Sequence, residues 1–130
     1  MADLNAGDAI QELHVTPDKY LPHRYAGASG DFNPIHIDPE FAKAVGLPNT
    51  ILHGLYMMGL AGRAATEAAG GDPRALKRLA VQFRGMGAPE TEIVVSGEVK
   101  SVEDGKAMID VVAAQGENQT IRNAEAEIQL

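Results

Sequence analysis

The sequence predicts an α+β fold in which one long helix packs against an antiparallel sheet. A run of small and apolar residues from about Gly54 to Ala69, closed by Gly70-Gly71, indicates the helix. Four runs in the second half of the chain read as strands, at 75–85, 91–102, 106–115 and 119–130. Apolar and polar residues alternate in the second of these runs, which is typical of antiparallel strands with one buried face.

Length and composition favour a single globular domain over residues 1–130. Hydrophobic residues make up 45% and charged residues 22%, and no apolar run approaches the roughly 20 residues that span a membrane. The start of the chain does not resemble a signal peptide, so we expect a cytoplasmic protein with no membrane partner. A net charge of −7 argues against nucleic acid as a partner, and the absence of cysteine excludes disulfides and thiolate chemistry.

Turn and helix signals divide the rest of the chain into short elements. Residues 9–16 are expected to form a strand, and 18–27 a helix with Pro22 in its first turn, where few backbone donors are needed. Asp104-Gly105 predicts a hairpin turn, and Gly116-Glu117-Asn118 predicts a second one. These hairpins would join the last three strands in chain order.

Residues 38–46 have the start and stop signals of a short helix. Asp38 is suited to the N-cap, Pro39 to the first helical position and Gly46 to the left-handed position after the last turn. This gives Asp38 a structural role, so we do not count it among the catalytic candidates.

The long helix is unusual because much of its surface consists of glycine and alanine. Glycine inside an exposed helix costs up to about 1 kcal/mol relative to alanine. We therefore expect a buried helix that another element, such as a sheet wrapped around it, approaches closely. The small residues are Gly54, Gly59, Ala61, Gly62, Ala64, Ala65, Ala68 and Ala69.

The segment 29–41, SGDFNPIHIDPEF, gathers titratable groups in a turn-forming sequence. Taken singly, Asp31 reads as a turn residue and His36 as a core histidine. Asn33-Pro34, however, is a rigid turn that can bring Asp31 and His36 towards one point. A carboxylate and an imidazole at one point can each handle a proton, as the addition of water across a double bond requires.

His53-Gly54 would supply the remaining requirement of such an addition, which is stabilisation of the developing enolate oxygen. The start of a helix presents free backbone N–H groups and a partial positive charge. Glycine at position 54 would allow a carbonyl oxygen to approach its N–H without obstruction.

A metal site is the alternative interpretation of the same segment. Asp31 and Asn33 match the first two ligands of a calcium loop, but Ile35 and Ile37 occupy its next positions. His36 and His53, the nearest candidates for zinc, lack the usual ligand spacing. The sequence therefore predicts neither a metal nor a cofactor.

Residues 25–42 and 53–64, YAGASGDFNPIHIDPEFA and HGLYMMGLAGRA, resemble the MaoC-like, (R)-specific enoyl-thioester hydratases of the hydratase 2 type. The likeness is especially marked to single-domain catalytic subunits of actinobacterial (3R)-hydroxyacyl-carrier-protein dehydratases. Ala28 departs mildly from the signature, where a larger aliphatic residue or glycine is more usual. The residues that match are Tyr25, Ser29, Gly30, Asp31, Asn33, Pro34, Ile35, His36 and Ala42.

The resemblance implies the hot dog fold, an antiparallel sheet wrapped around one long central helix. It also implies reversible hydration of trans-2-enoyl thioesters of CoA or acyl carrier protein to (R)-3-hydroxyacyl thioesters. The units would pair, as a homodimer or as a heterodimer with a related hot dog subunit, with the acyl chain in the cleft between them. Gly62 stands where some members carry a serine that supports the catalytic aspartate.

The resemblance also implies a role for each residue of the candidate site. Asp31 and His36 would hold the catalytic water, with His36 as its activator and Asp31 as the proton donor to the α-carbon, or with the two roles reversed. Gly54 would bind the thioester oxygen through its N–H. Asn33 would orient the loop and the water, and His53 would contribute to substrate binding.

Two alternative functions are compatible with the same fold. One is a hot dog acyl-CoA thioesterase, whose carboxylate would be placed elsewhere on the sheet or helix. The other is an acyl-thioester-binding subunit of a hetero-oligomeric dehydratase, which would lack the aspartate–histidine pair that this chain has.

Overall fold

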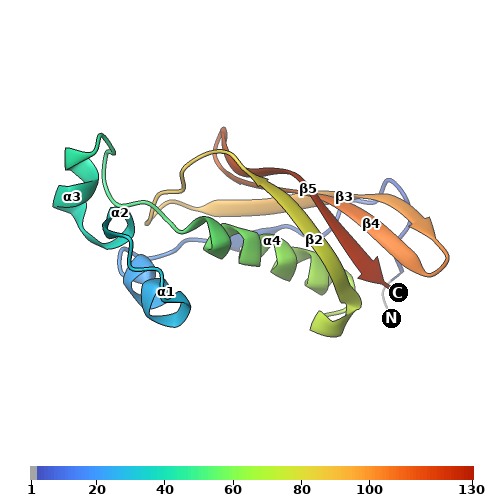
Figure 1. Ribbon diagram of the computed structural model, residues 1–130. Helices are drawn as coiled ribbons and strands as arrows, with labels where there is room; N and C mark the ends of the chain where they lie inside the picture. The colour runs from blue at the N-terminus through green and yellow to red at the C-terminus, as the bar shows by residue number, and fades with distance from the viewer. Residues whose placement is uncertain (1–2) are drawn as a thin grey trace.

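The computed structural model describes residues 3–130 as one five-stranded antiparallel sheet with helices on one side and at one end (Figure 1). The strands lie in the order β1-β3-β4-β5-β2, so that β1 and β2 form the two edges. Helix α4 runs along one face of the sheet, whereas α1, α2 and α3 gather beyond its end. The elements are β1 (Leu13–Val15), α1 (Leu21–Ser29), α2 (Pro34–Ile37), α3 (Pro39–Ala44), α4 (Gly54–Ala68), the 3-10 turn η1 (Pro73–Ala75), β2 (Leu76–Phe83), β3 (Ile93–Glu103), β4 (Lys106–Gln115) and β5 (Asn118–Gln129).

The predicted architecture is confirmed in the second half of the chain. Each of the four strands lies within two residues of its expected bounds, and both predicted hairpins form. Asp104 and Gly105 have φ values of 52° and 72°, as a two-residue turn between twisted strands requires. Gly116, with φ of 60°, opens the other turn. The two turns set the registers Glu103↔Lys106 and Gln115↔Asn118.

The core lies between the sheet and one face of α4. Apolar side chains alternate inward along β3, β4 and β5, since successive residues of a strand point to opposite faces. On α4 the buried residues recur at helical spacing, and the alanines among them are small enough for the sheet to approach closely. The buried core residues include Met57, Leu60, Ala61, Ala64 and Ala65 of the helix and Ile93, Val95, Val99, Ile109, Val111, Ile121 and Ile128 of the strands.

The expectation of a buried helix packed closely against the sheet is confirmed for one side of α4, and the other side is exposed in the single chain. A Cβ atom on Gly59 would meet no atom within 4 Å, and Leu55 is 61% exposed. Gly62 is the close-approach position, because a Cβ there would lie 3.4 Å from Leu79 Cδ2. The sheet therefore covers one side of the helix, and the other side is open.

No helix within residues 3–130 has the length and apolar character to cross a membrane.

The first half of the chain departs from expectation in three places. The helix expected over residues 18–27 is α1, which begins only at Leu21 and ends at Ser29. Of the predicted strand 9–16, only β1 pairs regularly with β3, so the strand is shorter than expected. Before β1, the Ile10 N–H still donates to the Gly97 carbonyl at 3.0 Å. The segment predicted as a turn contains the additional helix α2. Asn33 caps this helix and Pro34 occupies its first position, both of which are helix-start signals in a very short element.

Asp38 has the predicted role of N-cap. Its Oδ1 atom accepts hydrogen bonds from the backbone N–H groups of Glu40 at 3.0 Å and Phe41 at 3.3 Å. Gly46 has φ of 96° beyond the last turn of α3, the left-handed conformation that glycine adopts without strain.

We predict that Asp38→Ala lowers the free energy of unfolding by about 1 kcal/mol, because two N–H groups of α3 lose their acceptor. Denaturant titration of both proteins measures this difference. A stable variant that had lost all catalytic function would show that Asp38 has a chemical role as well.

Candidate active site at the start of the long helix

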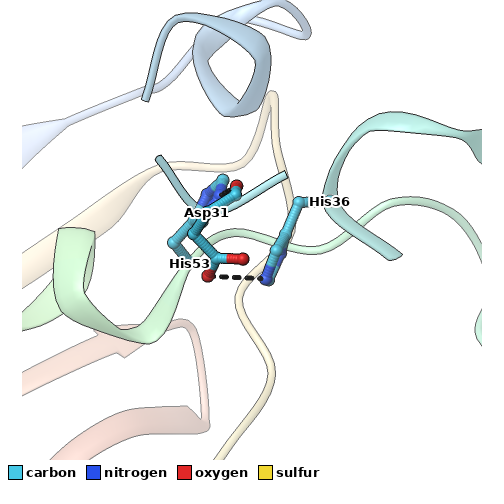
Figure 2. A group of neighbouring side chains, drawn as sticks. All are labelled: Asp31, His36 and His53. Atoms are coloured by element: carbon cyan, nitrogen blue, oxygen red, sulfur yellow. Dashed lines mark hydrogen bonds and ion pairs between the residues drawn. The ribbon is translucent and has the colours of Figure 1, made fainter. Parts of the chain in front are cut away.

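Three elements bring Asp31, His36 and His53 together at the end of the sheet (Figure 2). Asp31 lies in the loop between α1 and α2, His36 lies in α2, and His53 immediately precedes α4. The Asp31 Oδ2 atom is 3.8 Å from His36 Nε2. The histidine side chain is 9% exposed and the aspartate side chain 53%, so the pair lies at an accessible edge of the interior. The structure thus places side by side the two residues predicted to act as a pair.

A succession of side-chain turns shapes the loop that carries Asp31. Ser29 Oγ accepts from the Asp31 N–H, Asp31 Oδ1 accepts from the Asn33 N–H, and Asn33 Oδ1 accepts from the Ile35 N–H, each at 3.2 Å. Short polar side chains favour such local bonds over regular structure. Asp31 therefore uses one carboxylate oxygen to hold the loop and presents the other to His36. Asn33 caps α2, and a contact between Asn33 and substrate stays a prediction.

The backbone around His36 determines which ring nitrogen carries hydrogen in the neutral imidazole. His36 Nδ1 lies 2.8 Å from the Ile51 carbonyl oxygen, which can only accept a hydrogen bond. Nδ1 must therefore donate, and Nε2 carries the lone pair that faces Asp31. Two acceptors cannot bond each other directly, but at 3.8 Å apart they suit one water molecule that donates a hydrogen to each.

His53 is buried behind this pair. Its side chain is 2% exposed, and Nε2 donates to the Asp31 backbone carbonyl at 3.0 Å. The ring stacks on the His36 ring with centroids 3.8 Å apart and an angle of 21° between the planes. These contacts tie His53 to the site residues themselves; a direct contact between His53 and substrate stays a prediction.

Two tyrosines complete the wall on the side of His53 away from His36. The Tyr25 ring lies 4.7 Å from the His53 ring and 5.8 Å from the Tyr56 ring, measured between centroids. Partial burial raises the pKa of the Tyr56 phenol above its ordinary value.

Gly54 begins α4 beside the dyad formed by Asp31 and His36. No side chain caps this helix, so its first N–H groups are available to an incoming acceptor. A Cβ at position 54 would lie 3.1 Å from Cδ1 of Phe83, the half-exposed last residue of β2. The space over Gly54 is therefore bounded by an aromatic ring that the sequence analysis did not single out.

Two cavities meet at Gly54 and Phe83. One, of about 310 Å³, opens onto Asp31 and is lined also by Tyr25, Ser29, His53 and Leu55. The other, of about 240 Å³, opens onto His36 and reaches the buried side chains of Leu52, Met57 and Thr120. A larger groove of about 610 Å³ between α1 and residues 86–90 touches none of Asp31, His36 and Gly54, so its size does not make it the catalytic site.

Two polar residues from the β4–β5 hairpin hold the loop that lines the second cavity. The buried Gln115 side chain bonds Ala88 through both the N–H and the carbonyl, each at 2.8 Å, and Asn118 donates to the Met86 carbonyl at 2.9 Å. Gly87 in turn accepts from the Leu52 N–H at 2.8 Å. The sequence analysis did not predict this role of Gln115. The signal that could have indicated it is a polar residue at an inward-facing position of a strand.

The same histidines and aspartate form a group whose potential metal-ligand atoms all lie within 4.8 Å of one another. The two imidazole rings, however, are stacked nearly parallel. A metal held about 2 Å from one nitrogen in the plane of its ring would lie far outside the plane of the other ring. The arrangement therefore suits a pair of proton-handling groups better than a metal ion.

Comparison with known proteins identifies the family of the chain. Residues 6–120 match the model of the MaoC-like domain. The chain is 50% identical over 75 residues to the peroxisomal enoyl-CoA hydratase 2 of Arabidopsis thaliana, covering 57% of this chain and 23% of that protein. It is 36% identical over 117 residues to the peroxisomal hydratase-dehydrogenase-epimerase of Neurospora crassa, covering 83% of this chain and 12% of that protein. The chain thus spans less than a quarter of either relative.

Among solved structures, a chain of the ChsH1–ChsH2 complex from Mycobacterium tuberculosis superimposes with a TM-score of 0.86 at 25% identity. The match covers 96% of this chain and 97% of that one. The hot dog fold expected from the sequence is thereby confirmed along nearly the whole chain. The family match covers most of the chain and includes the aspartate–histidine loop and the start of α4. On this evidence the chain belongs to the family of MaoC-like domains.

Proposed function

We propose that the chain catalyses the reversible hydration of trans-2-enoyl thioesters of CoA or acyl carrier protein to (R)-3-hydroxyacyl thioesters. The observation that carries the proposal is the arrangement of Asp31 and His36, two proton acceptors 3.8 Å apart beside the uncapped start of α4. The names of the relatives, which include enoyl-CoA hydratase 2, support the same reaction. The (R) configuration of the product follows from the resemblance to the hydratase 2 type.

The dyad supplies the water and moves its proton. Water bound between Asp31 Oδ2 and His36 Nε2 has its oxygen free to attack C3 of the enoyl thioester. His36 takes one proton of this water as the C–O bond forms. With the bridging water consumed, the protonated imidazole and the carboxylate close to a direct hydrogen bond, through which the proton passes to Asp31 and from there to C2. The water is consumed as a hydroxyl group on C3 and a hydrogen on C2, and the dyad returns to its starting state. The reverse division of labour between Asp31 and His36 balances equally.

The backbone N–H of Gly54 binds the thioester carbonyl oxygen in this proposal. As the hydroxyl adds to C3, negative charge develops on the thioester oxygen, and a fixed backbone N–H at a helix start stabilises that charge. Gly54 lines both the cavity at Asp31 and the cavity at His36. A carbonyl bound there would hold C2 and C3 close to both members of the dyad.

The two alternative functions are less well supported by the site. A thioesterase has no evident use for the paired Asp31 and His36 in this loop, and it would release free thiol. A subunit that only binds the thioester does not require two facing proton acceptors. Analysis of the products separates all three functions.

We also propose that the chain works as a homodimer. Leu55, Phe83 and Met86 are 61%, 51% and 57% exposed, and they adjoin the two cavities at the active site. Strand β2 is an edge of the sheet whose outer backbone groups are available for pairing. A heterodimer with a related hot dog subunit is the alternative, since the similar ChsH1–ChsH2 structure is a complex of two different chains by its name.

The cytoplasmic location of this protein stays a prediction. Both relatives compared above are described as peroxisomal.

The first prediction concerns the dyad. Purified protein should hydrate crotonyl-CoA, seen as loss of enoyl-thioester absorbance, and chiral analysis should identify the (R)-alcohol. Asp31→Asn and His36→Ala should each lower kcat by about 10² to 10⁴, because general acid–base groups contribute on this scale. Thermal melts serve to verify that both variants are folded. Near-normal turnover by either variant would contradict the proposed roles.

Inactivity of the wild-type chain with crotonyl-CoA leads to the same assay with enoyl-acyl-carrier-protein. Release of free thiol with either substrate would establish the thioesterase instead. Inactivity with both substrates and no release of thiol would refute the hydratase proposal for the isolated chain.

The second prediction concerns the helix start. Gly54→Ala should lower kcat by at least about tenfold, because the methyl group would lie 3.1 Å from the Phe83 ring in the space that the carbonyl must enter. Gly59→Ala is the matched control on the same helix, since a methyl group there meets nothing within 4 Å. Equal activities of the two variants would remove Gly54 from the site.

The third prediction concerns assembly. Sedimentation equilibrium should give a mass twice that of the 13.8 kDa chain. Phe83→Glu should shift the protein towards the monomer, because a charge would be buried at the contact. A wild-type monomer under the same conditions would exclude the homodimer and direct the search to a different partner subunit.

A further inference from the structure

His53 is a buried residue in contact with both Asp31 and His36. It bonds the backbone of Asp31, stacks on the ring of His36 and directly precedes Gly54 (Figure 2). The mechanism described above assigns His53 no step. Its side chain is 2% exposed, so its place in the core is defined by the groups around it.

The surroundings of His53 also determine its tautomer. The Asp31 carbonyl can only accept a hydrogen bond, so the hydrogen of the neutral ring lies on Nε2. His53 Nδ1 has no hydrogen-bond partner, and it is the only buried side-chain nitrogen or oxygen in residues 3–130 for which this holds. A hydrogen on Nδ1 would be a buried donor without an acceptor. In the neutral ring, Nδ1 therefore carries a lone pair that no donor in residues 3–130 meets.

A neutral imidazole stacked on His36 has a consequence for the proposed reaction. While His36 holds the proton taken from water, it is a cation lying face to face with an uncharged aromatic ring at 3.8 Å. Such a ring face attracts a cation, and the attraction is stronger where water is excluded. Stacked rings cannot pass a proton through their faces, so His53 would stabilise the proton on His36 without accepting it.

We propose that His53 is a positioning residue for the hydration reaction. Its Nε2–H holds the Asp31 loop at the distance that admits one water, and its ring face stabilises His36 while that residue is protonated. The inference rests on the proposed function, because the second role needs a proton to move onto His36. Both roles affect the transition state more than the binding of substrate.

Two substitutions separate the two roles. His53→Gln keeps an N–H donor for Asp31 and loses the ring face, whereas His53→Phe keeps a ring for stacking and loses the donor. His14, an exposed histidine on β1 whose side chain is 51% exposed, provides the matched controls His14→Gln and His14→Phe. The assay is hydration of crotonyl-CoA, or of the enoyl-acyl-carrier-protein if only that is turned over. Thermal melting accompanies every variant.

Each variant at position 53 should lower kcat by about tenfold while KM changes by less than about threefold. The double change His53→Gln with His36→Ala should lose little more than His36→Ala alone, because the ring face then has no cation to stabilise. The controls at position 14 should match the wild type. A folded His53→Gln with wild-type kcat, or losses confined to KM, would overturn the proposal.

Long-range proton–nitrogen NMR of the wild-type imidazoles tests the geometry without any activity. The spectrum should show hydrogen on Nε2 of His53, no hydrogen on Nδ1 of His53, and hydrogen on Nδ1 of His36. A hydrogen on Nδ1 of His53 would overturn the inference, even if both variants at that position fail to fold. Absence of hydration by the wild type would instead refute the proposed function, and the spectrum would still decide whether His53 holds Asp31.

Discussion

The site depends on the short extended segment Ile51–His53, which joins the helices at the end of the molecule to the sheet and α4. The Ile51 carbonyl accepts from His36 Nδ1, and the Ile51 N–H donates to the Ile35 carbonyl at 3.1 Å. Leu52 bonds the Gly87 carbonyl from the loop after β2. His53 then reaches the Asp31 carbonyl before the chain enters α4. These three residues thus fix the positions of both members of the dyad, the cavity loop and the start of α4 relative to one another.

Preorganisation of this kind matters because the chemistry requires position more than strength. Two acceptors 3.8 Å apart order a water molecule only if neither turns away. The His36 ring is held by a backbone carbonyl and by its stack on His53, and Asp31 is held by its own loop. The Asp31 side chain, by contrast, is 53% exposed, so the dyad is open to solvent on that side.

The glycines and alanines of α4 serve different purposes on its two sides. On the buried side they let the sheet and the 3-10 turn approach, as the contact of Leu79 with Gly62 shows. On the open side Gly54 leaves room for a ligand atom beside Phe83, and Gly59 faces empty space. An uncovered helix face next to an unpaired edge strand and exposed apolar side chains is suited to a second subunit. The helix composition is thus explained by packing on one side and by access on the other.

The sequence by itself determined the local features of this protein. The strands of the second half, both hairpins, the Asp38 cap and the start of α4 were predictable because each depends on neighbouring residues, through alternation, turn conformation or capping. Asp31 and His36 were predictable as a pair because Asn33-Pro34 confines them within one loop. Helix α2 was missed because an Asn-Pro sequence also favours a plain turn.

Only the tertiary structure decided the features that depend on residues far apart in the chain. The features decided in this way are the packing of His53 against Tyr25 and His36, the Ile51 carbonyl as the partner of His36, the Phe83 ring beside Gly54 and the hydrogen bonds of Gln115 to the cavity loop. They are contacts across 15 to 29 positions of the chain. Local propensity contains no information on these contacts, because they form when the sheet and α4 bury their apolar faces against each other. That burial determines where the ends of the elements meet. The candidate active site lies at this meeting place.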